Sequence, residues 1–583
     1  MLRTHNCGML RKEDVGKDVC LTGWVNRRRD HGGVIFIDLR DRWGLTQLVI
    51  DSINQEIYQR ANTVKNEYVL QVKGKVRLRP EGLANLKIPT GEIELEVTSL
   101  SILSEAKLLP FEIEEKNETD ESLRFRYRYI DLRRKRMQNN MFLRHQVCQS
   151  VRHFLSDHQF IEVETPCLTK STPEGARDFL VPSRLNEGFF YALPQSPQLF
   201  KQILMIAGFD RYFQIVKCFR DEDLRADRQP EFTQVDIEMS FIEREDILQL
   251  IENMMTVVFH EVLGVTVDIP FPRLSYDEAM SRYGCDKPDL RIRLTIDDLS
   301  NCFDGEPGFI TREGAWKGIF FPEWKGFSRK KADFLAQSAK ETGVPLTWIK
   351  WNNNEITSPL KNKISESAWQ SLVQSYPFQE NSVLLVSWGD PKKVLPYLGN
   401  LRLTVGKELN SIENQFCFCW VLDFPLFEWN QEENRWDSMH HPFTSPILDN
   451  LDRLDIDPGQ VKSQAYDIVL NGFEVGGGSI RIHRSDLQEK IFRLLNLTEE
   501  EIQQKFGFFI EALQYGCPPH GGIALGLDRL IMLMAGEESI REVIAFPKTQ
   551  KGTCLMTGAP SPVADDQLQI LGVKLRKNKP REI

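Results

Sequence analysis

The sequence predicts a multidomain α+β protein with a small N-terminal β-barrel, an antiparallel sheet with helices in its main domain, and an inserted α/β domain. Three observations predict this organisation. The first hundred residues contain five strand-like segments with a helical stretch after the third. Residues 219–241 place polar side chains at strand spacing on two arms around a charged loop. Strand and helix signals alternate over residues 285–410.

The N-terminal segments have the order of an OB-fold, a barrel that commonly binds oligonucleotides. Phe36 and Gln47 fall on adjacent predicted strands. An exposed aromatic ring can stack on a splayed base, and a glutamine can hydrogen-bond to the base edge. The strand pattern alone favours a core position for Phe36, because Ile35 and Ile37 flank it. The expected strands are 18–28, 33–40, 44–51, 67–79 and 91–103, with the helix at about 53–65.

The domain boundaries follow from shifts in composition. A polar stretch at 111–122 predicts a hinge, and a helix at about 139–157 precedes a strand that ends near Pro166. The predicted parts are the barrel (1–106), the hinge (107–138), the first part of the main domain (139–284), the insertion (285–410), and the second part with a C-terminal extension (411–583).

Composition and charge limit the class of protein. The 583 residues are 41% hydrophobic and 27% charged, and eleven cysteines are scattered without a CxxC pair. No run approaches the roughly 18 apolar residues of a membrane helix, and the N-terminus lacks a secretory signal. We therefore expect a cytoplasmic protein with reduced thiols and no membrane partner. The net charge is −10, yet residues 1–79 carry 15 Lys+Arg against 9 Asp+Glu, which suggests that this part faces a polyanion.

The two arms within 219–241 predict one polar wall of a site. Cys218, Arg220 and Glu222 alternate on the first arm, and Gln234, Asp236 and Glu238 alternate on the second. A core strand is not expected to carry so many ionisable groups inward, because an unpaired buried charge costs several kcal/mol or more. The alternative is a solvated edge hairpin with surface salt bridges.

A second segment, GIALGLDRLIMLMAG (522–536), predicts a helix with an arginine in its first turn. Arg529 opposes the helix dipole, by about 1 kcal/mol or less, so an anion such as a polyphosphate would compensate it. The alternative is an arginine paired with Asp528 or another nearby carboxylate. The buried stripe is expected to comprise Leu527, Leu530, Ile531, Leu533 and Met534.

A hairpin over 465–483 predicts a pair of carboxylates. Asn471-Gly472 is a strong two-residue turn signal. It places Val469 opposite Glu474 and makes Asp467 the diagonal neighbour of Glu474 on the same face. Magnesium accepts one or two carboxylates together with phosphate oxygens, so Asp467 and Glu474 are the predicted Mg²⁺ ligands. The alternative is an acidic pair that faces solvent.

Six segments of the chain resemble segments of the bacterial-type aspartyl-tRNA synthetases. These enzymes are class II aminoacyl-tRNA synthetases of subclass IIb. The first two, 219–241 and 522–536, are similar to motifs 2 and 3 of that class. The resemblance covers nearly the whole chain and implies activation of L-aspartate with ATP and Mg²⁺, followed by transfer to the 3′ end of a tRNA. The other four segments are STPEGARDF (171–179), QSPQLFKQ (195–202), MHHPFTSP (439–446) and GFEVGGGSIRIH (472–483).

The resemblance also implies roles for individual residues. Arg220 would contact the α-phosphate and the amino-acid carboxylate, Arg529 the γ-phosphate, and Phe232 the adenine ring; Arg220 and Arg529 are the expected catalytic residues. Arg481 and Lys201 would bind the side-chain carboxylate, which distinguishes aspartate from asparagine. The remaining expected aspartate-binding residues are Glu174, Gln198, Asp236 and His440. The remaining expected ATP-binding residues are Asp221, Glu222, Gln229, Glu474, Gly526, Leu527 and Asp528.

The N-terminal matches bear on the choice of tRNA. His31 and Gly82 occupy positions that vary in the family with tolerance for a second tRNA. The resemblance therefore implies charging of tRNA(Asp) and also of tRNA(Asn), after which an amidotransferase would have to convert the misacylated product. It further implies a homodimer built on the segment 139–166. The expected anticodon and discrimination residues are Arg28, His31, Phe36, Gln47 and Gly82.

Four alternatives stay open at this point. The chain could be strictly specific for tRNA(Asp), or it could be an asparaginyl or lysyl enzyme, which the long insertion and the Lys201–Arg481 pair disfavour. It could be an OB-fold RNA-binding paralogue without charging activity, which the intact Arg220, Glu474 and Arg529 disfavour. Activation of aspartate without tRNA would leave the N-terminal barrel unexplained.

Overall fold

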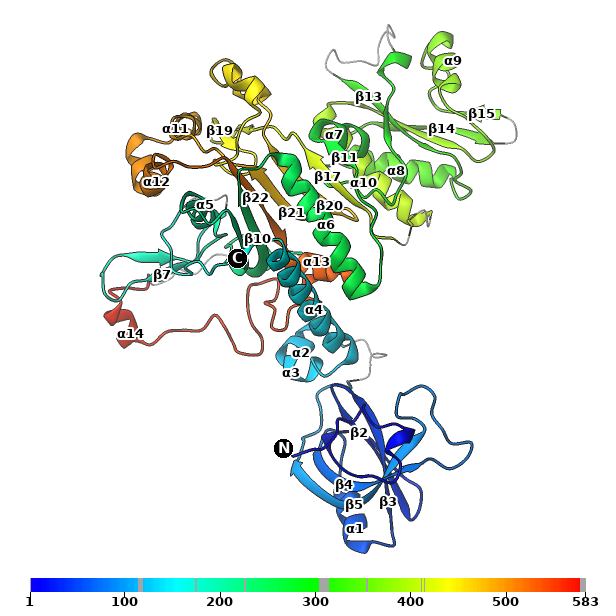
Figure 1. Ribbon diagram of the computed structural model, residues 1–583. Helices are drawn as coiled ribbons and strands as arrows, with labels where there is room; N and C mark the ends of the chain where they lie inside the picture. The colour runs from blue at the N-terminus through cyan, green and yellow to red at the C-terminus, as the bar shows by residue number, and fades with distance from the viewer. Residues whose placement is uncertain are drawn as a thin grey trace. The chain divides into compact units, whose positions relative to one another are not determined.

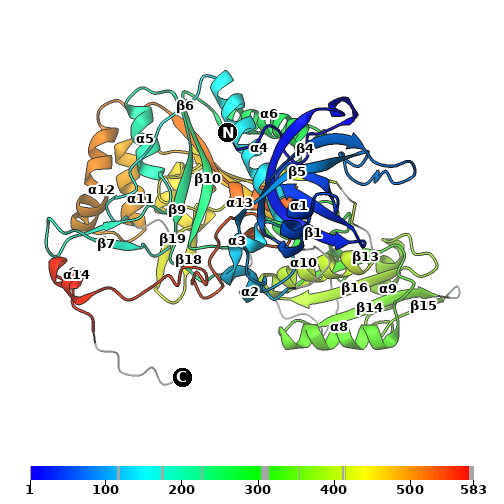
Figure 2. The ribbon, with the colours of Figure 1, turned by 90° about the horizontal axis from the view of Figure 1, so that it is seen from below.

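The computed structural model of the chain divides into two units, Met1–Gln138 and Asn139–Ile583, shown in Figures 1 and 2. Each unit is described by itself, and the finer domain boundaries within them remain predictions. No helix in the described part of the chain is long and apolar enough to cross a membrane. The structure describes residues 2–113, 119–172, 176–224, 227–303, 314–352, 355–409, 412–413 and 415–576.

The first unit contains a closed barrel with strand order β1-β2-β3-β5-β4. Alternate residues point inward, so Ile35, Ile37 and Leu39 of β2 are fully buried in its core. Helix α1 follows the third strand, as the sequence predicts. The elements are η1 (Lys12–Asp14), β1 (Asp18–Asp30), β2 (Val34–Asp41), β3 (Gly44–Asp51), α1 (Gln55–Thr63), β4 (Val69–Leu78) and β5 (Ile93–Ser104).

Two short helices, α2 (Glu121–Arg126) and α3 (Arg128–Asp131), follow the barrel. The fully buried Asp131 organises them, because Arg128 Nη1 donates to its Oδ2 at 2.6 Å and Arg124 Nε donates to its Oδ1 at 2.9 Å. Helix α4 (Lys135–Asp157) then begins earlier than the expected 139, and strand β6 (Ile161–Glu162) is shorter than the sequence suggests.

The second unit is built on an eight-stranded sheet with the order β11-β17-β20-β21-β22-β10-β9-β6. Strands β17, β20, β21, β22, β10 and β9 pair antiparallel, whereas β11 and β6 at the edges pair parallel. The bounds are β9 (Arg211–Phe219), β10 (Glu231–Ser240), β11 (Arg273–Ser275), β17 (Phe418–Leu422), β20 (Ala465–Leu470), β21 (Phe473–Ile480) and β22 (His520–Gly526).

One face of this sheet carries the main core, formed with α4, α6 (Arg244–Leu263) and α13 (Leu527–Met534). Figure 1 shows α6 lying along the strands, with the short α13 near one end of the sheet. The core includes Val235 and Ile237, two alternate residues that form the apolar face of β10. Helix α13 buries Met532 rather than Leu533, which is only partly buried at the edge of the cluster. The intervening residues of β10 therefore face away from this core, toward the polar side of the sheet.

The chain between α6 and β17 forms a separate five-stranded sheet with the order β12-β13-β16-β14-β15, all antiparallel. Hydrophobic clusters with α8 and α10 and with α9 complete it, and Figure 2 shows these helices around the strands. Its elements are β12 (Ile296–Asp298), η2 (Ser300–Cys302), β13 (Ala315–Phe321), α8 (Arg329–Glu341), β14 (Leu346–Asn352), β15 (Glu355–Thr357), α9 (Glu366–Gln374), β16 (Val383–Gly389) and α10 (Pro391–Glu408).

The remaining elements surround the polar side of the main sheet or extend from it. They are β7 (Leu180–Pro182), β8 (Phe190–Ala192), α5 (Gln198–Ile206), α7 (Tyr276–Tyr283), β18 (Phe427–Asn430), β19 (Arg435–Ser438), η3 (Leu448–Asp455), η4 (Pro458–Gln460), α11 (Ser485–Leu494), α12 (Glu499–Leu513), η5 (Ile540–Glu542) and α14 (Asp565–Ile570).

Candidate active site

A pocket of about 360 Å³ lies over the polar face of the main sheet. Its walls come from α5, β10, β21, β22 and the start of α13, and thus from segments up to about 330 residues apart. The structure brings most of the predicted site residues together here. Those that line the pocket are Gln198, Lys201, Arg220, Glu222, Gln229, Phe232, Asp236, His440, Asp467, Glu474, Arg481, Gly526, Asp528 and Arg529.

Three predicted residues are not among the pocket-lining residues. Asp221 is exposed, and its backbone N–H donates to the carbonyl oxygen of Arg177 at 3.0 Å. Leu527 is fully buried in the main core on the other face of the sheet, because it belongs to the apolar stripe of α13. Glu174 lies outside the described residues.

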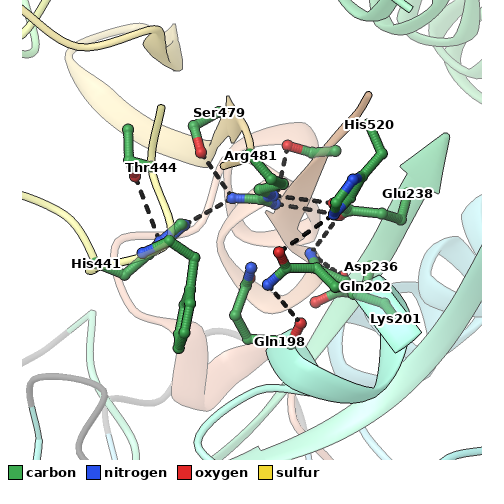
Figure 3. A network of polar contacts seen from close by, with 12 residues as sticks. Gln198, Lys201, Gln202, Asp236, Glu238, His441, Thr444, Ser479, Arg481 and His520 are labelled. Carbon is green, nitrogen blue, oxygen red and sulfur yellow. Dashed lines mark hydrogen bonds and ion pairs between the residues drawn. The ribbon is translucent and has the colours of Figure 1, made fainter. Parts of the chain in front are cut away.

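Three buried ion pairs hold the part of the pocket formed by α5, β10 and the end of β21 (Figure 3). Lys201 Nζ lies 2.5 Å from Asp236 Oδ1 and 3.2 Å from Glu238 Oε2. Arg481 Nε lies 2.9 Å from Glu238 Oε1, and Nη2 lies 3.2 Å from Oε2. All four side chains are at most 1% exposed. The prediction that the polar residues of 219–241 form one wall of a pocket is confirmed, and the alternative of a solvated edge hairpin is wrong, because β10 lies between β22 and β9. These charges are buried because they are paired.

The two carboxylates respond differently to this burial. Burial alone would raise the pKa of Glu238, but the charges of Arg481 and Lys201 outweigh it and lower this pKa to about 2. For Asp236, burial prevails over the attraction of Lys201 and raises the pKa. Asp236 Oδ2 has no hydrogen-bond partner among the described residues, nor does Gln198 Nε2. An acceptor and a donor are thus available at the pocket wall.

His441 is a pocket residue that the sequence reasoning missed. Its Nε2 lies 2.6 Å from Arg481 Nη1, and Arg481 Nη1 also donates to Ser479 Oγ at 2.8 Å. Burial, together with the charge of Arg481, lowers the pKa of His441 well below its usual value. The ring is therefore neutral and accepts at Nε2. Its position beside His440 in the MHHPFTSP segment was the available signal.

A second missed group lies behind Lys201. His520 is fully buried; its Nε2 lies 3.2 Å from Gln202 Oε1, and its Nδ1 lies 2.8 Å from the carbonyl oxygen of Pro518. Gln202 Nε2 in turn donates to the carbonyl oxygen of Gln198 at 3.2 Å. Figure 3 shows this chain of contacts alongside the ion pairs. It ties the first turns of α5 to β22.

The part of the pocket near the end of β9 and the start of α13 carries two arginines. Arg220 follows β9, and its guanidinium carbon lies 5.1 Å from the ring centroid of Phe232. Arg529 Nη2 lies 3.3 Å from Asp227 Oδ2, and its Nη1 donates to the carbonyl oxygen of Glu474. The alternative of a nearby carboxylate partner for Arg529 is thus confirmed, and that partner is Asp227 rather than Asp528.

Gln229 was expected to contact the nucleotide, but its side-chain amide is already paired. Its Nε2 donates to the carbonyl oxygen of Lys548 at 3.0 Å, and its Oε1 accepts from the backbone N–H of Lys548 at 2.7 Å. Gln229 as a whole is only 3% exposed to solvent. Gln229 therefore fixes the chain after η5 against the pocket wall.

The predicted hairpin register is confirmed at the turn, where Leu470 pairs with Phe473 and Val469 with Glu474. A bulge, where the register shifts between Ile468 and Val469, then places Asp467 opposite Gly477. Both carboxylates still face one space, because a Cβ on Gly477 would lie 2.6 Å from Asp467 Oδ1 and 4.0 Å from Glu474 Oε1. The charge of Asp467, together with burial, raises the pKa of Glu474.

This carboxylate pair is not a complete protein cage for a metal ion. No group of three or more His, Cys, Asp or Glu side chains that could hold a metal occurs among the described residues. Two carboxylates together with phosphate oxygens are, however, a donor set that Mg²⁺ accepts. His440 Nε2 lies 3.4 Å from Asp467 Oδ1; burial alone would lower the pKa of His440, but the charge of Asp467 outweighs it and raises this pKa.

Two of the five predicted RNA-binding residues, Phe36 and His31, lie outside the barrel core. Phe36 is only partly buried while Ile35 and Ile37 are fully buried, so the core alternative for Phe36 is wrong. The rings of Phe36 and His31 meet edge to face, with centroids 5.5 Å apart. Gln47 lies on the neighbouring strand, opposite Asp38.

The other three predicted barrel residues are arranged differently. Gln47 is 7% exposed; its Oε1 accepts from Arg29 at 3.3 Å and its Nε2 donates to Glu94 at 2.9 Å. Arg28 is turned toward α1, where its Nε donates to the carbonyl oxygen of Ala61 at 3.2 Å. Gly82 has a φ of +79°, and a Cβ there would have no neighbouring atom within 4 Å.

An antiparallel sheet with arginines at its polar face, a buried Lys–Asp–Glu–Arg network and an N-terminal OB barrel define a class II tRNA synthetase. The family model of the class II tRNA synthetases (D, K and N) matches residues 120–550, and that of the OB-fold nucleic acid binding domain matches residues 19–103. An asparaginyl-tRNA synthetase from Pyrococcus horikoshii, solved with asparaginyl-adenylate, has the same fold at a TM-score of 0.61 and 20% identity, covering 94% of this chain and 99% of that one.

Relatives of higher sequence identity show which branch of the class II tRNA synthetases the chain belongs to. An aspartate–tRNA(Asp/Asn) ligase of Desulfatibacillum aliphaticivorans is 51% identical over 587 residues, which cover 99% of this chain and 98% of that protein. Another, from Thermotoga neapolitana, is 53% identical over 587 residues, which cover 99% of this chain and 100% of that protein. The chain belongs to this family of aspartate–tRNA ligases.

Proposed function

We propose that this chain charges both tRNA(Asp) and tRNA(Asn) with L-aspartate, using ATP and Mg²⁺. The observation that carries the proposal is the pocket itself, where a buried lysine–arginine pair at one end faces two arginines and two carboxylates at the other. The first end suits a dicarboxylic amino acid and the second a triphosphate. The curated relatives named for both tRNAs support the wider tRNA range.

At the amino-acid end, Arg481 and Lys201 bind the side-chain carboxylate of aspartate. The Nε–Nη2 side of Arg481 is paired with Glu238, so Nη1, which now contacts His441 Nε2, is the donor proposed to turn to the substrate carboxylate. The amide N–H of asparagine would instead place one donor against another. Asp236 Oδ2 accepts from the substrate ammonium group, since this buried oxygen has no other hydrogen-bond partner among the described residues. Gln198 and His440 complete this lining. Glu174 is proposed to close over the same ammonium group.

At the nucleotide end, Phe232 stacks on adenine and Glu222 contacts the nucleotide. Arg220 binds the α-phosphate, where negative charge accumulates as the aspartate carboxylate attacks, and Arg529 binds the γ-phosphate. Such transfers need alignment and cations more than covalent help from the protein. Asp467 and Glu474 would hold Mg²⁺, which neutralises phosphate charge when bound.

The barrel binds the anticodon through Phe36 and neighbouring groups, with Arg28 and Gln47 as predicted contributors. Stacking of a base on Phe36 contributes about 1–3 kcal/mol. His31 and Gly82 permit the anticodon of tRNA(Asn) as well as that of tRNA(Asp). Aspartyl-tRNA(Asn) would then be the substrate of an amidotransferase. We further propose that the enzyme acts in the cytoplasm as a homodimer formed through α4 and β6.

Two assays test the proposal. Pyrophosphate exchange with a panel of amino acids should respond to aspartate and not to asparagine or lysine. Aspartylation of purified tRNA(Asp) and tRNA(Asn) side by side should proceed with both. Charging of tRNA(Asp) alone would show a strictly specific enzyme, and exchange without any charging would contradict the proposed tRNA range altogether.

A further inference from the structure

An arginine of α4 joins three elements beside the nucleotide half of the pocket. Arg144 Nη1 donates to Asp528 Oδ1 at 2.5 Å, and its Nη2 donates to Thr233 Oγ1 at 2.9 Å. Asp528 Oδ2 accepts the backbone N–H of Thr233 at 2.7 Å. These three residues belong to α4, β10 and α13, which are far apart in the sequence.

Both carboxylate oxygens of Asp528 are therefore committed to protein donors, and the residue is only 3% exposed. This arrangement disagrees with the expectation that Asp528 contacts ATP, because neither oxygen is free for a nucleotide group. Its neighbours explain its position instead. Phe232 precedes Thr233, and Arg529 follows Asp528. The hydrogen bonds among Arg144, Asp528 and Thr233 therefore fix the distance between Phe232 and Arg529.

We propose that Arg144 is a positioning residue for ATP, acting through the Asp528–Thr233 pair on Arg529 and Phe232. This inference rests on the proposed nucleotide roles of Phe232 and Arg529. Arg144 is not among the pocket-lining residues, so it acts without touching the substrate. Charge-assisted hydrogen bonds of this kind are short and directional, and losing one partner leaves the other buried charge unpaired.

The amino-acid half of the pocket is held by a different set of contacts. Lys201, Asp236, Glu238 and Arg481 form their own network on α5, β10 and β21, and Arg144 makes none of the hydrogen bonds described for it. A perturbation of Arg144 should therefore separate the two substrates. General damage to the fold would affect both.

The test compares ATP and aspartate in Arg144→Met. The KM for ATP in pyrophosphate exchange should rise about 10- to 100-fold, since a displacement approaching 1 Å costs on the order of 100-fold in a positioned site. Binding of labelled L-aspartate without ATP should stay within about twofold of the wild type. Arg144→Lys, which restores the charge and one hydrogen bond, should recover part of the loss. Parallel losses for both substrates would overturn the inference.

Two further variants keep the test decisive. Thr233→Val removes one acceptor of Arg144 with little change in shape and should raise the KM for ATP by a smaller factor, even if Arg144→Met fails to fold. Arg493→Met, an exposed arginine of α11 paired with Glu489 and Glu499, is the matched control and should behave like the wild type. Normal ATP kinetics in Thr233→Val and Arg144→Lys would overturn the inference.

Failure of the inference is distinguishable from failure of the proposed function. Arg529→Ala probes the phosphate role directly. If Arg529→Ala abolishes exchange while Arg144→Met leaves the KM for ATP unchanged, only the positioning role of Arg144 is overturned. If Arg529→Ala retains normal exchange, the nucleotide assignment itself is wrong, and the positioning role built on it is overturned too.

Discussion

Substitution of Gly477 by alanine tests the proposed metal and phosphate site most directly. Gly477 lies on β21 opposite Asp467, and a Cβ there would lie 2.6 Å from Asp467 Oδ1. Ordinary van der Waals contact begins at 3.4 Å, so the carboxylate must move by about 0.8 Å. A side chain can make such a shift, whereas the backbone of β20 need not move.

The expected effect is a loss of function with little loss of stability. Catalytic groups act within about 0.5 Å of their productive positions, and a displacement near 1 Å costs on the order of 100-fold. Gly477→Ala should therefore lower pyrophosphate exchange about 10- to 100-fold. It should also raise the Mg²⁺ concentration needed for half-maximal exchange, measured at fixed ATP and aspartate. The unfolding temperature should change by only a few degrees.

The neighbouring glycine supplies a contrast. A Cβ on Gly478 would lie 2.1 Å from the backbone carbonyl oxygen of Gly522, which cannot move without disturbing the pairing of β21 with β22. Gly478→Ala should therefore lower the unfolding temperature strongly. Normal exchange and normal Mg²⁺ dependence in a folded Gly477→Ala would refute the assignment of Asp467 to the metal site.

Three further predictions address other parts of the chain. Phe36→Ala should raise the KM for tRNA about 5- to 150-fold, as expected from a lost stack of about 1–3 kcal/mol, and should leave pyrophosphate exchange intact; loss of both would contradict a separate anticodon module. Arg529→Ala should abolish exchange, measured at saturating aspartate, and near-normal exchange would contradict its role at the phosphates. Glu238→Gln should lower the free energy of unfolding at pH 7 by about 3–5 kcal/mol, because Arg481 loses its buried partner. Burial alone would raise the pKa of Glu238, but Arg481 and Lys201 lower it from 4.5 to about 2, so this contribution is fully present above about pH 4.5 and is lost as the pH falls toward 2. Urea unfolding from pH 7 to about pH 2.5 should therefore show a difference from the wild type that is constant at neutral pH and shrinks below about pH 4.5. A difference that grows on acidification would contradict the ion pair.

The barrel was predictable because its signals are local. Alternating burial on β2 and the helix after β3 both follow from the printed sequence. That pattern did not decide the position of Phe36. Ile35 and Ile37 lie on the opposite face of the strand, and either face could point into the barrel. The closure of the barrel decides it, since a closed barrel buries only the inner face.

The sequence predicted most of the residues that line the pocket, but fewer of the contacts between them. The hairpin register at Asn471 follows from turn chemistry, yet the bulge that places Asp467 opposite Gly477 does not. The partner of Arg529 is Asp227, which lies about 300 residues earlier and comes near only through the fold. Long-range pairs of this kind leave no periodic trace in a sequence.

The buried network also changes how the selection of aspartate must work under the proposed function. Lys201 and Arg481 are already matched by Asp236 and Glu238, so the pocket does not offer two free positive charges. Selectivity must then come from fixed donors. Arg481 Nη1 is held at 2.6 Å from His441 Nε2, a position that a carboxylate oxygen of the substrate can share or take. A network paired this tightly keeps those donors aimed before the substrate arrives, so less ordering entropy is lost on binding, and a carboxamide that cannot accept from both donors leaves one of them buried and unpaired.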